Sequence, residues 1–446
     1  MKKILRILSI FLALVLVLSC AAYAGSNFAF TQEERDATAA QWEAIQADDT
    51  VITLSVGSEA GSIGFTWLSG LFDGAQKIRI SESSDMASPR ELKVKSSLTL
   101  FMKMTNKATA DNLEAGKEYW YSYTENGGWS EPQKFTAQSG DKYTAIFTSD
   151  AQIGRSGDAK DTDVLINDTC GWQRTVRTAI QRYPDTAFFI SSGDQTEQGF
   201  SLKQYKAFLS PAELRNYPIA NAVGNHDFYF PAYTYFSNNP NQVKEVLASP
   251  AGFGYYFCYG DALYIIINSN DMFAPDQAKL LKAATSAYPD AKWRIAVLHH
   301  SSYSADYDEG DFAFDRSVFA PLFDAYDIDL ALSGHDHMYS CTYPVYAGEK
   351  NDDGTVYLQA SSASGSNIYG ASESLDVIRY AFDEAIATYT ALEFENGNLT
   401  INTYRTDTDT LVDTVTLEKS EKQAKNALQI FIEWLRSFFD TLSKMF

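Results

Sequence analysis

The five histidines of this 446-residue chain are confined to three short motifs. They are His226 in the run GNHD, His299 and His300 in LHHS, and His335 and His337 in GHDH. Each motif follows a short apolar run of the kind that predicts a buried strand. Imidazole is a common ligand for zinc and iron, so the motifs together indicate a metal centre at the ends of neighbouring strands.

Two aspartates complete this pattern, because Asp150 and Asp194 each follow a further apolar run. Five strand ends would then bring together Asp, Asp, Asn, His and His-x-His, a ligand set for two metal ions that share one carboxylate. Asp194 is the candidate bridging ligand, since each of its two oxygens could contact one ion. We expect His335 and His337 to alternate along an extended segment, so that one faces each ion.

Each motif taken alone also fits an ordinary turn whose side chain bonds to the backbone. The metal interpretation rests on all five motifs occurring in this order, each after an apolar strand. Two ions about 3.5–4 Å apart are a recurrent device for phosphoryl transfer, in which they stabilise the attacking and leaving oxygens.

The order and spelling of the motifs resemble the calcineurin-like metallophosphoesterases, whose pattern runs D-x-H, G-D, G-N-H-[DE], a lone H and G-H-x-H. Within that family the chain is most similar to the purple acid phosphatases, which have D-x-G, then G-D-x-x-Y, and often H-S-P-W-Y as the fourth motif. The run HHSSY at residues 299–303 aligns with this fourth motif and places the ligand at His299. The resemblance extends over residues 50–415.

This resemblance implies two divalent or mixed-valence metal ions, of iron, zinc or manganese. The first ion would bind Asp150, Asp194 and His337, with Gln152 as a weaker ligand. The second ion would share Asp194 and bind Asn225, His299 and His335. A hydroxide that bridges the two ions would attack phosphorus in line, without a covalent enzyme intermediate.

The resemblance also implies roles around the substrate. His226 would protonate the leaving oxygen or bind phosphate, and Asp227 is the nearest candidate partner for its ring. Asn225 and His300 would lie beside the substrate together with His226. The implied activity is hydrolysis of phosphomonoesters by a secreted, acid-phosphatase-like enzyme. The alternatives are a phosphodiesterase or nucleotidase on the same scaffold, and a non-catalytic binding protein that keeps the fold.

Three features depart from the family pattern. Glu197 stands where the purple enzymes have the tyrosine that colours an iron(III) centre, and Gln152 replaces the histidine of D-x-H. The first ion therefore has fewer strong ligands, and manganese, zinc or iron(II) fit the residues as well as iron(III). Gln152 would offer its amide oxygen or serve as a turn residue. The acidic segment 304–314 lacks the further histidines of plant-type relatives, and is either a solvated loop or part of the site.

The N-terminus predicts export from the cytoplasm. Basic residues precede an apolar run at 7–18, and the run AYA at 22–24 matches the small-x-small pattern of signal-peptidase cleavage. We therefore expect residues 1–24 to be a signal peptide and the mature protein to be secreted. The run VLSC offers an alternative, in which Cys20 is lipidated and anchors the protein outside the cytoplasm.

The composition indicates a folded, acidic protein, with a formal net charge of −21 and 45% hydrophobic residues. This charge argues against nucleic acid bound through a basic face, because phosphate contacts require clustered lysine and arginine. A small phosphate ester remains a suitable partner, since charge repulsion is screened beyond about 8 Å. Cys170, Cys258 and Cys341 would form one disulfide with one free thiol, or remain buried thiols.

The region before the metal motifs contains a helical segment and a β-rich segment. Residues 25–49 predict a short helix, which Thr31 and Glu34 would open with a capping box. Residues 50–138 predict seven short strands, the number typical of a β-sandwich. The run NLEAGKEYWY resembles the L-x-P-G-x-x-Y-x-Y signature of fibronectin type III-like modules, which commonly precede the catalytic domain of purple acid phosphatases.

The metal motifs lie in a region where apolar strands alternate with helices, such as a helix expected at 172–182. This alternation over residues 139–418 predicts α/β packing. The resemblance implies an α/β (α+β) metallophosphoesterase fold of two facing β-sheets flanked by helices. Residues 419–446 predict an amphipathic helix that docks on the body, self-associates or lies on a membrane surface.

Overall fold

The computed structural model describes residues 26–125, 127–246, 249–305, 309–371, 375–382, 384–419 and 427–444. The predicted signal peptide at 1–24 and the alternative lipid site Cys20 lie outside these residues. In the described ranges, no helix combines the length and the apolar character needed to cross a bilayer.

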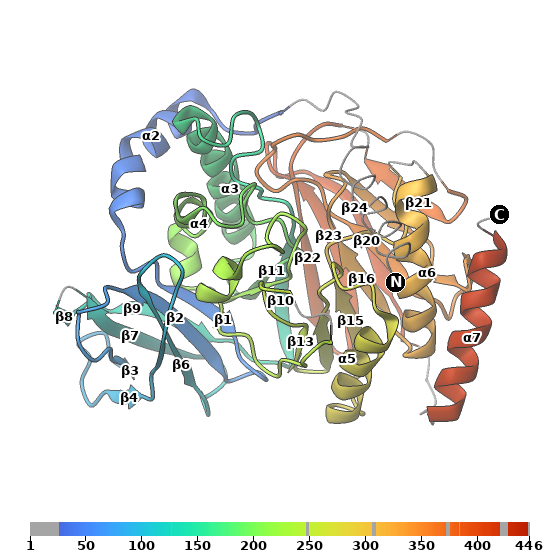
Figure 1. The fold of residues 1–446 in the computed structure, drawn as a ribbon, viewed down its shortest axis with the longest axis horizontal. Helices are drawn as coiled ribbons and strands as arrows, with labels where there is room; N and C mark the ends of the chain where they lie inside the picture. The colour runs from blue at the N-terminus through green and yellow to red at the C-terminus, as the bar shows by residue number, and fades with distance from the viewer. Residues whose placement is uncertain are drawn as a thin grey trace, which may run out of the picture.

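Two large β-sheets form the centre of the molecule (Figure 1). The first has ten strands in the order β24 (Leu411–Leu417), β23 (Asn398–Arg405), β22 (Thr388–Glu395), β10 (Lys142–Thr148), β11 (Thr186–Ser191), β12 (Ile219–Asn221), β1 (Thr53–Val56), β2 (Ile63–Ser69), β6 (Met104–Ala110) and β5 (Lys95–Leu98). The second has seven strands in the order β13 (Tyr255–Tyr259), β14 (Ala262–Ile266), β15 (Trp293–Val297), β16 (Leu330–Ser333), β20 (Val356–Gln359), β17 (Tyr339–Thr342) and β21 (Ile378–Phe382).

The central strands of both sheets run parallel, and their inner faces pack against each other. β10, β11 and β12 are parallel in the first sheet, as are β14, β15, β16 and β20 in the second. Phe147 and Phe188 of the first sheet share one buried cluster with Tyr264 and Ile295 of the second. Strands buried on both faces read as continuous apolar runs, which is why the sequence identified them. The predicted α/β fold with two facing sheets is confirmed.

Helices cover the outer faces of the two sheets. The first sheet packs under α3 (Thr162–Arg182), with α2 (Gln32–Ala47) and α4 (Leu202–Phe208) beside it. The second packs under α5 (Ala274–Ala287) and α6 (Glu309–Ala325), and α7 (Ala427–Lys444) lies against α6 (Figure 1). The remaining short helical turns are η1 (Ala212–Arg215) and η2 (Pro231–Tyr235).

Two helix starts test the sequence analysis. The capping box at α2 is present, because Thr31 and Glu34 each bond to the backbone of the other. The start of α3 was placed too late, since the helix begins at Thr162 rather than at Trp172. The Asp161 side chain caps it by accepting from the Asp163 N–H, and the first turns are rich in polar residues that mask the apolar period.

The β-rich region at 50–138 forms a sandwich that shares a sheet with the rest of the molecule. Its second sheet contains β4 (Arg90–Leu92), β3 (Ile78–Ser81), β7 (Lys117–Glu125) and β8 (Gly128–Trp129), and β9 (Gln133–Ala137) pairs with β7. Phe65 of β2 packs on Tyr121 and Phe135 of this sheet. β1 also pairs in parallel with β12, at Ser55 and Ile219. The sandwich is therefore joined edge to edge to the first large sheet, and its fibronectin type III-like identity stays a prediction.

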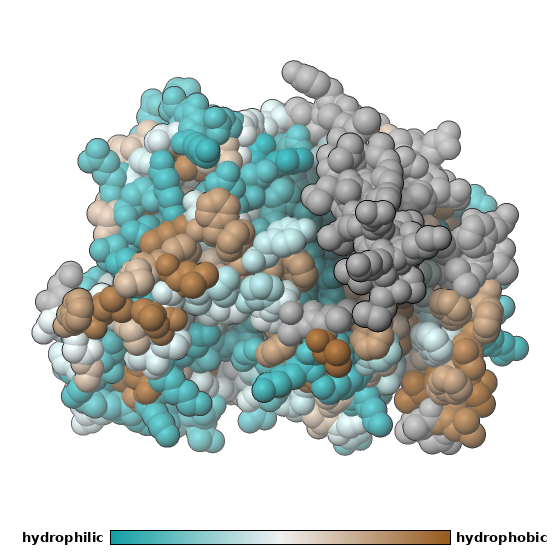
Figure 2. Space-filling model, viewed as in Figure 1, coloured by the Kyte–Doolittle hydropathy of each residue, from teal (hydrophilic) through white to brown (hydrophobic). Residues whose placement is uncertain are grey.

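The C-terminal helix α7 docks on the body through one face. Ile430 and Trp434 pack against the cluster that includes α6, and the Ser437 hydroxyl bonds to Asp324 of α6. Other apolar side chains of α7 remain exposed and form a hydrophobic strip (Figure 2); they are Leu428, Phe431, Ile432 and Phe439. Docking on the body, one of the three expected roles of this helix, is therefore observed. Self-association and membrane contact stay predictions.

The prediction of one disulfide with one free thiol is wrong for the described residues. Cys170, Cys258 and Cys341 are all free thiols, and two of them, Cys170 and Cys341, are buried. The alternative of buried thiols therefore fits these two positions, and the fold does not depend on a disulfide between the three.

Candidate metal centre

The residues singled out in the sequence meet where the parallel strands end. Asp150 follows β10, Asp194 follows β11 and Asn225 follows β12 in the first sheet. In the second sheet His299 follows β15, and His335 and His337 follow β16. The carboxyl ends of parallel strands are the usual position of ligand sites in open α/β sheets.

The two aspartates are fixed in the same way. Asp150 accepts the His335 N–H at Oδ2 (2.9 Å), and Asp194 accepts the His226 N–H at Oδ1 (2.9 Å). The other oxygen of each carboxylate faces the centre. We expected Asp194 to offer one oxygen to each ion, but Oδ1 is bonded to the backbone, and Oδ2 lies near both groups of ligands, at 3.3 Å from His299 Nε2 and 3.4 Å from Gln152 Nε2.

The backbone is held in an unusual conformation at the centre. Positive φ angles occur at Asp150 (49°), Gln152 (33°), Asp194 (48°), His335 (76°) and His337 (50°). Such residues cost on the order of 1–3 kcal/mol each and cluster at functional sites. The expected extended segment at His335–His337 is therefore wrong; the chain bends there.

Close approach of the motifs explains these bends. A Cβ atom at Gly334 would lie 1.9 Å from Ser149 Oγ and 2.3 Å from Asp150 Oδ2. A Cβ atom at Gly224 would lie 1.9 Å from Asp194 Oδ1. Both motifs therefore require glycine, because only a residue without a side chain lets the next strand end reach the carboxylate.

Four ligand atoms converge in one half of the centre, which we call the His299 half; its residues are Asp194, Asn225, His299 and His335. His299 Nε2 lies 2.9 Å from Asn225 Oδ1 and 3.3 Å from His335 Nδ1. His335 Nδ1 lies 3.1 Å from Asn225 Oδ1. Ligands about 2.0–2.2 Å from a metal ion stand about 2.8–3.6 Å apart, the shorter spacing in octahedral and the longer in tetrahedral geometry. The spacing of these atoms thus suits the edges of a metal coordination shell.

The other half, which we call the His337 half, contains Asp150, Gln152, His337 and the shared Asp194. His337 Nε2 lies 3.4 Å from Asp150 Oδ1. His337 Nδ1 lies 3.1 Å from the Ser366 carbonyl and 3.0 Å from the Asn367 carbonyl, so Nδ1 carries the proton and Nε2 offers its lone pair. Asp150 Oδ1 and Gln152 Oε1 are buried without a hydrogen-bond partner among the described residues. Buried polar atoms of this kind fit a bound cation.

The charges of the centre also fit a cation. Burial raises the pKa of Asp194, but His299 and His226 lower it overall, and His337 likewise lowers the pKa of Asp150 against the effect of burial. Burial lowers the pKa of His299, but Asp194 and Asp150 raise it to about 9. Burial and His299 lower the pKa of His335 to about 4. The buried carboxylates thus attract a positive charge, which a metal ion supplies as well as a proton does.

His226 contacts a different acid from the one expected. Its Nδ1 lies 2.9 Å from the Glu197 carbonyl and 3.4 Å from Glu197 Oε2, and its Nε2 lies 3.9 Å from Asp194 Oδ2. Asp227 accepts the Gly224 N–H (3.1 Å) and the Tyr205 hydroxyl (3.2 Å) instead. The prediction that Asp227 holds the His226 ring is therefore wrong, because residues 225–229 form a turn rather than an extended segment.

His300 lies beside the His299 half, next to His335. Its Nδ1 lies 2.9 Å from Ser269 Oγ, and its ring centre lies 4.7 Å from that of His335. Burial and the neighbouring His335 hold the pKa of His300 well below its usual range, so its ring is neutral. Its predicted role in substrate binding stays a prediction.

Sequence reasoning missed Arg155 and Tyr369, which border the His337 half, and the contacts that Glu197 makes there. Arg155 Nη2 lies 3.4 Å from the Tyr369 hydroxyl, and the Tyr369 ring centre lies 5.5 Å from that of His337. Glu197, noted only for the absent tyrosine, lies 3.6 Å from Arg155. Proximity of Arg155 to the first motif could have drawn attention to it, but no signal links it to Tyr369, more than 200 residues away along the chain.

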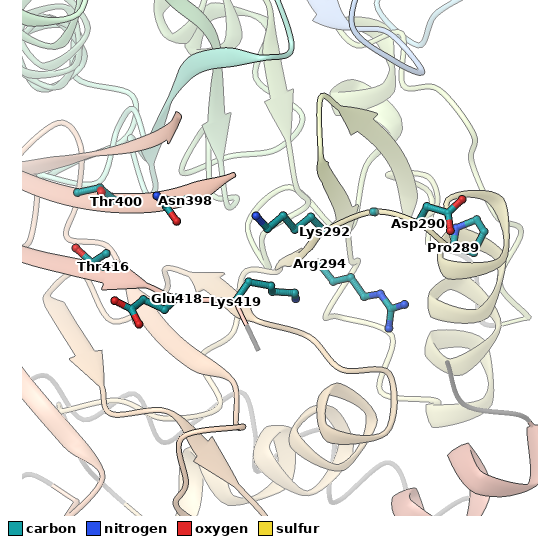
Figure 3. Close-up of a pocket in the computed structure, with 10 residues that line it drawn as sticks. Pro289, Asp290, Lys292, Arg294, Asn398, Thr400, Thr416, Glu418 and Lys419 are labelled. Atoms are coloured by element: carbon teal, nitrogen blue, oxygen red, sulfur yellow. The ribbon is translucent and has the colours of Figure 1, made fainter. Parts of the chain in front are cut away.

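A surface pocket elsewhere on the molecule is separate from the metal centre (Figure 3). It is lined by Lys292, Arg294 and Lys419, among other residues, and lies where β15 begins, whereas His299 follows the end of that strand. Arg294 pairs with Asp327 at 3.7 Å and Lys419 with Asp329 at 2.6 Å. Two of its cations thus already have acidic partners.

Comparison with known proteins agrees with this geometry. Residues 163–339 match the calcineurin-like phosphoesterase family, a range that includes every ligand candidate except Asp150 and Gln152. The chain therefore contains a calcineurin-like phosphoesterase domain. Purple acid phosphatase PPD1 from yellow lupin (Lupinus luteus) seeds has a similar structure, with a TM-score of 0.65 and 15% sequence identity over 85% of this chain and 75% of that one. At this identity the likeness shows a shared fold.

Sequence relatives cover a smaller part of the chain. An uncharacterized protein of Mycobacterium tuberculosis, matched in strains CDC 1551 / Oshkosh and ATCC 25618 / H37Rv, is 29% identical over 147 residues. The match spans 28% of this chain and 26% of each relative, so it covers about a quarter of the length of those proteins. The resemblance first seen in the motifs is confirmed by the family match and the shared fold.

Proposed function

We propose that this chain is a secreted, metal-dependent phosphomonoesterase of the acid phosphatase type. The observation that supports it is the convergence of two buried carboxylates, one amide and three histidines at the strand ends, together with the phosphoesterase domain. Two metal ions bound there would supply Lewis-acid charge opposite the negative charge that develops on a phosphoryl group. Iron, zinc and manganese are all suited to this mixed set of nitrogen and oxygen ligands.

In this proposal His226 delivers a proton to the leaving oxygen. Its Nδ1 is engaged by the Glu197 carbonyl, so Nε2 is the atom directed toward Asp194 and the centre. Burial disfavours the charged ring, but Asp194 and Glu197 raise the pKa of His226 above its usual value. Two bound metal ions would offset the contribution of Asp194, so the contact with Glu197 is what favours the proton on His226, as a general acid requires.

Hydrolysis assays separate the proposed activity from its alternatives. The protein, with its metal content measured, is tested on p-nitrophenyl phosphate and on bis(p-nitrophenyl) phosphate. We expect kcat/KM to be higher for the monoester. Faster hydrolysis of the diester would favour a phosphodiesterase, and a metal-loaded protein that hydrolyses neither ester would favour a binding protein. Asp194→Asn serves as the inactive control.

Export forms the second part of the proposal and has its own test. It rests on the apolar run and the AYA motif within residues 1–24. Expression of the full chain in a bacterial host, followed by fractionation and N-terminal sequencing, should give an exported protein that begins at Gly25. A blocked, lipid-modified Cys20 would instead support the anchored form, and cytoplasmic protein that retains Met1 would refute export.

A further inference from the structure

Arg155 is held at the edge of the His337 half by a fixed turn. Oδ2 of Asp168, which is buried in α3, accepts the N–H groups of Gly154 (2.7 Å) and Ser156 (3.3 Å), the residues on either side of Arg155. The Arg155 side chain is 34% exposed. A partly exposed guanidinium on an anchored turn is positioned to meet a ligand with little loss of conformational entropy.

The guanidinium contacts residues that lie next to His337 on one side and next to His226 on the other. Toward His337, its Nη2 contacts the Tyr369 hydroxyl at 3.4 Å. With the Asn367 amide oxygen turned toward the guanidinium, Nε and Nη2 donate to that oxygen at 3.1 and 3.2 Å. Toward His226, its Nη1 lies 3.6 Å from Glu197 Oε1. Arg155 is therefore held beside the neighbours of both histidines, and its charge is close enough to interact with that of Asp194.

Burial at this position disfavours a positive charge unless neighbouring groups or a bound anion stabilise it. Burial opposes the charge, but Tyr369, Glu197 and Asp194 together raise the pKa of Arg155, so the guanidinium stays charged. Its contact with Glu197, at 3.6 Å, is longer than a hydrogen bond and is not a bidentate pair. Nε and Nη2 are engaged by Asn367 and Tyr369, whereas Glu197 balances the charge from beyond hydrogen-bond distance and so leaves the N–H groups of Nη1 for an oxyanion.

We propose that Arg155 binds a terminal oxygen of the substrate phosphoryl group and makes the site selective for phosphomonoester dianions over phosphodiesters. The proposal rests on the phosphoesterase function proposed above. A monoester dianion presents unesterified oxygens on the side away from its leaving group, and charge-assisted bonds from arginine to such oxygens are strong. A diester carries one charge fewer and a second organic group, so it gains less from Arg155.

The first test compares Arg155→Gln with Arg182→Gln. Arg182 is a matched control, because its side chain is 35% exposed and pairs with Asp409 at the end of α3 that precedes β11, away from the strand ends that bear the ligands. We expect Arg155→Gln to lower kcat/KM for p-nitrophenyl phosphate by about 10- to 100-fold. Hydrolysis of bis(p-nitrophenyl) phosphate should change by less than about threefold. Arg182→Gln should change neither rate.

The second test measures binding directly and does not depend on turnover. Calorimetric titration with inorganic phosphate should show a Kd raised by about 10- to 100-fold in Arg155→Gln, with metal content equal to that of the wild type. Arg155→Lys keeps the charge but loses the contacts through which Asn367 and Tyr369 orient the guanidinium, so its effects should be smaller than those of Arg155→Gln in both assays. This variant also tests the proposal if Arg155→Gln fails to fold.

The outcomes distinguish this inference from the function on which it rests. Equal losses on monoester and diester, or an unchanged phosphate Kd in a folded and metal-loaded variant, would overturn the role of Arg155 and leave the phosphoesterase proposal intact. A wild-type protein that hydrolyses neither ester would refute the proposed function, whereas the phosphate titration would still test whether Arg155 binds the oxyanion.

Discussion

The two halves of the candidate metal centre share one carboxylate but are built differently. In the His299 half, His299 Nε2, His335 Nδ1 and Asn225 Oδ1 lie within 3.3 Å of one another, and Asp194 Oδ2 lies 3.3 Å from His299 Nε2. In the His337 half, His337 Nε2 and Asp150 Oδ1 are 3.4 Å apart. Gln152 there turns its amide nitrogen, not its oxygen, toward Asp194.

This difference predicts that the two halves would bind metal ions with unequal strength. Two imidazoles, an amide oxygen and a carboxylate form a complete four-ligand set in the His299 half. The His337 half has one imidazole and two carboxylates, and its glutamine stands where the family pattern has a histidine. We therefore expect the His299 half to hold its ion firmly and the His337 half to exchange its ion more readily.

Asp194→Asn should have the largest effect, because Asp194 Oδ2 lies near the ligands of both halves. The amide loses the charge and offers at most one oxygen ligand. Loss of metal-centred stabilisation amounts to several kcal/mol, which corresponds to a decrease in kcat/KM on the order of 10⁴-fold. Metal analysis and an aryl phosphate assay measure both consequences. A variant with two metals per chain and normal turnover would remove Asp194 from its bridging role.

His226→Ala should reduce the rate without disturbing either half. The His226 side chain is directed to Glu197, and only its backbone N–H bonds to Asp194 Oδ1. We expect a rate loss of about 10²–10⁴-fold as the general acid is removed, with metal content unchanged. The loss should be smaller for nitrophenyl esters, whose leaving group needs no proton, than for alkyl phosphates. Equal losses on both esters would point to phosphate binding, and loss of metal would make His226 a ligand.

The sequence located the candidate ligands because each one follows a buried parallel strand. Asp150, Asn225 and His299 could be assigned to strand ends from apolar runs alone, since such strands show no polar alternation. The left-handed backbone at His335 and His337 could not be predicted, because it depends on Gly334 fitting against Ser149 and Asp150 of another strand. Those contacts exist only in the folded chain.

Long-range partners were the other features beyond the reach of the sequence. Arg155 meets Asn367 and Tyr369, and β1 joins β12, across separations that no local pattern records. The Glu197 position shows the same limit. Comparison with the family motif revealed that a tyrosine was missing at this position. Only the structure shows that Glu197 lies between Arg155 and His226.

Gln152→His should reduce the difference between the two halves, because it restores the histidine of the family pattern to the His337 half. Gln152 has a φ of 33°, a region in which histidine is more frequent than most residues. An imidazole ligand should raise zinc affinity of the weaker half by roughly tenfold. Competition with a chelator, followed by metal analysis, should show two unequal sites in the wild type and nearly equal ones in the variant. Gln152→Ala is the control and should widen the difference.

The smallest expected effect concerns visible absorption. Among the described residues, neither half contains a phenolate ligand, which the family pattern would place in the His337 half. Glu197 occupies the position of the colouring tyrosine, and Glu197 is directed to His226 and Arg155. Tyr369 lies near His337, yet its hydroxyl contacts Arg155 and Asn367. A phenol engaged in those bonds is not a ligand, so even an iron-loaded protein should lack a strong charge-transfer band, and Tyr369→Phe should leave the spectrum unchanged. A band in the wild type that disappears in Tyr369→Phe would show that Tyr369 replaces the missing tyrosine and completes the His337 half.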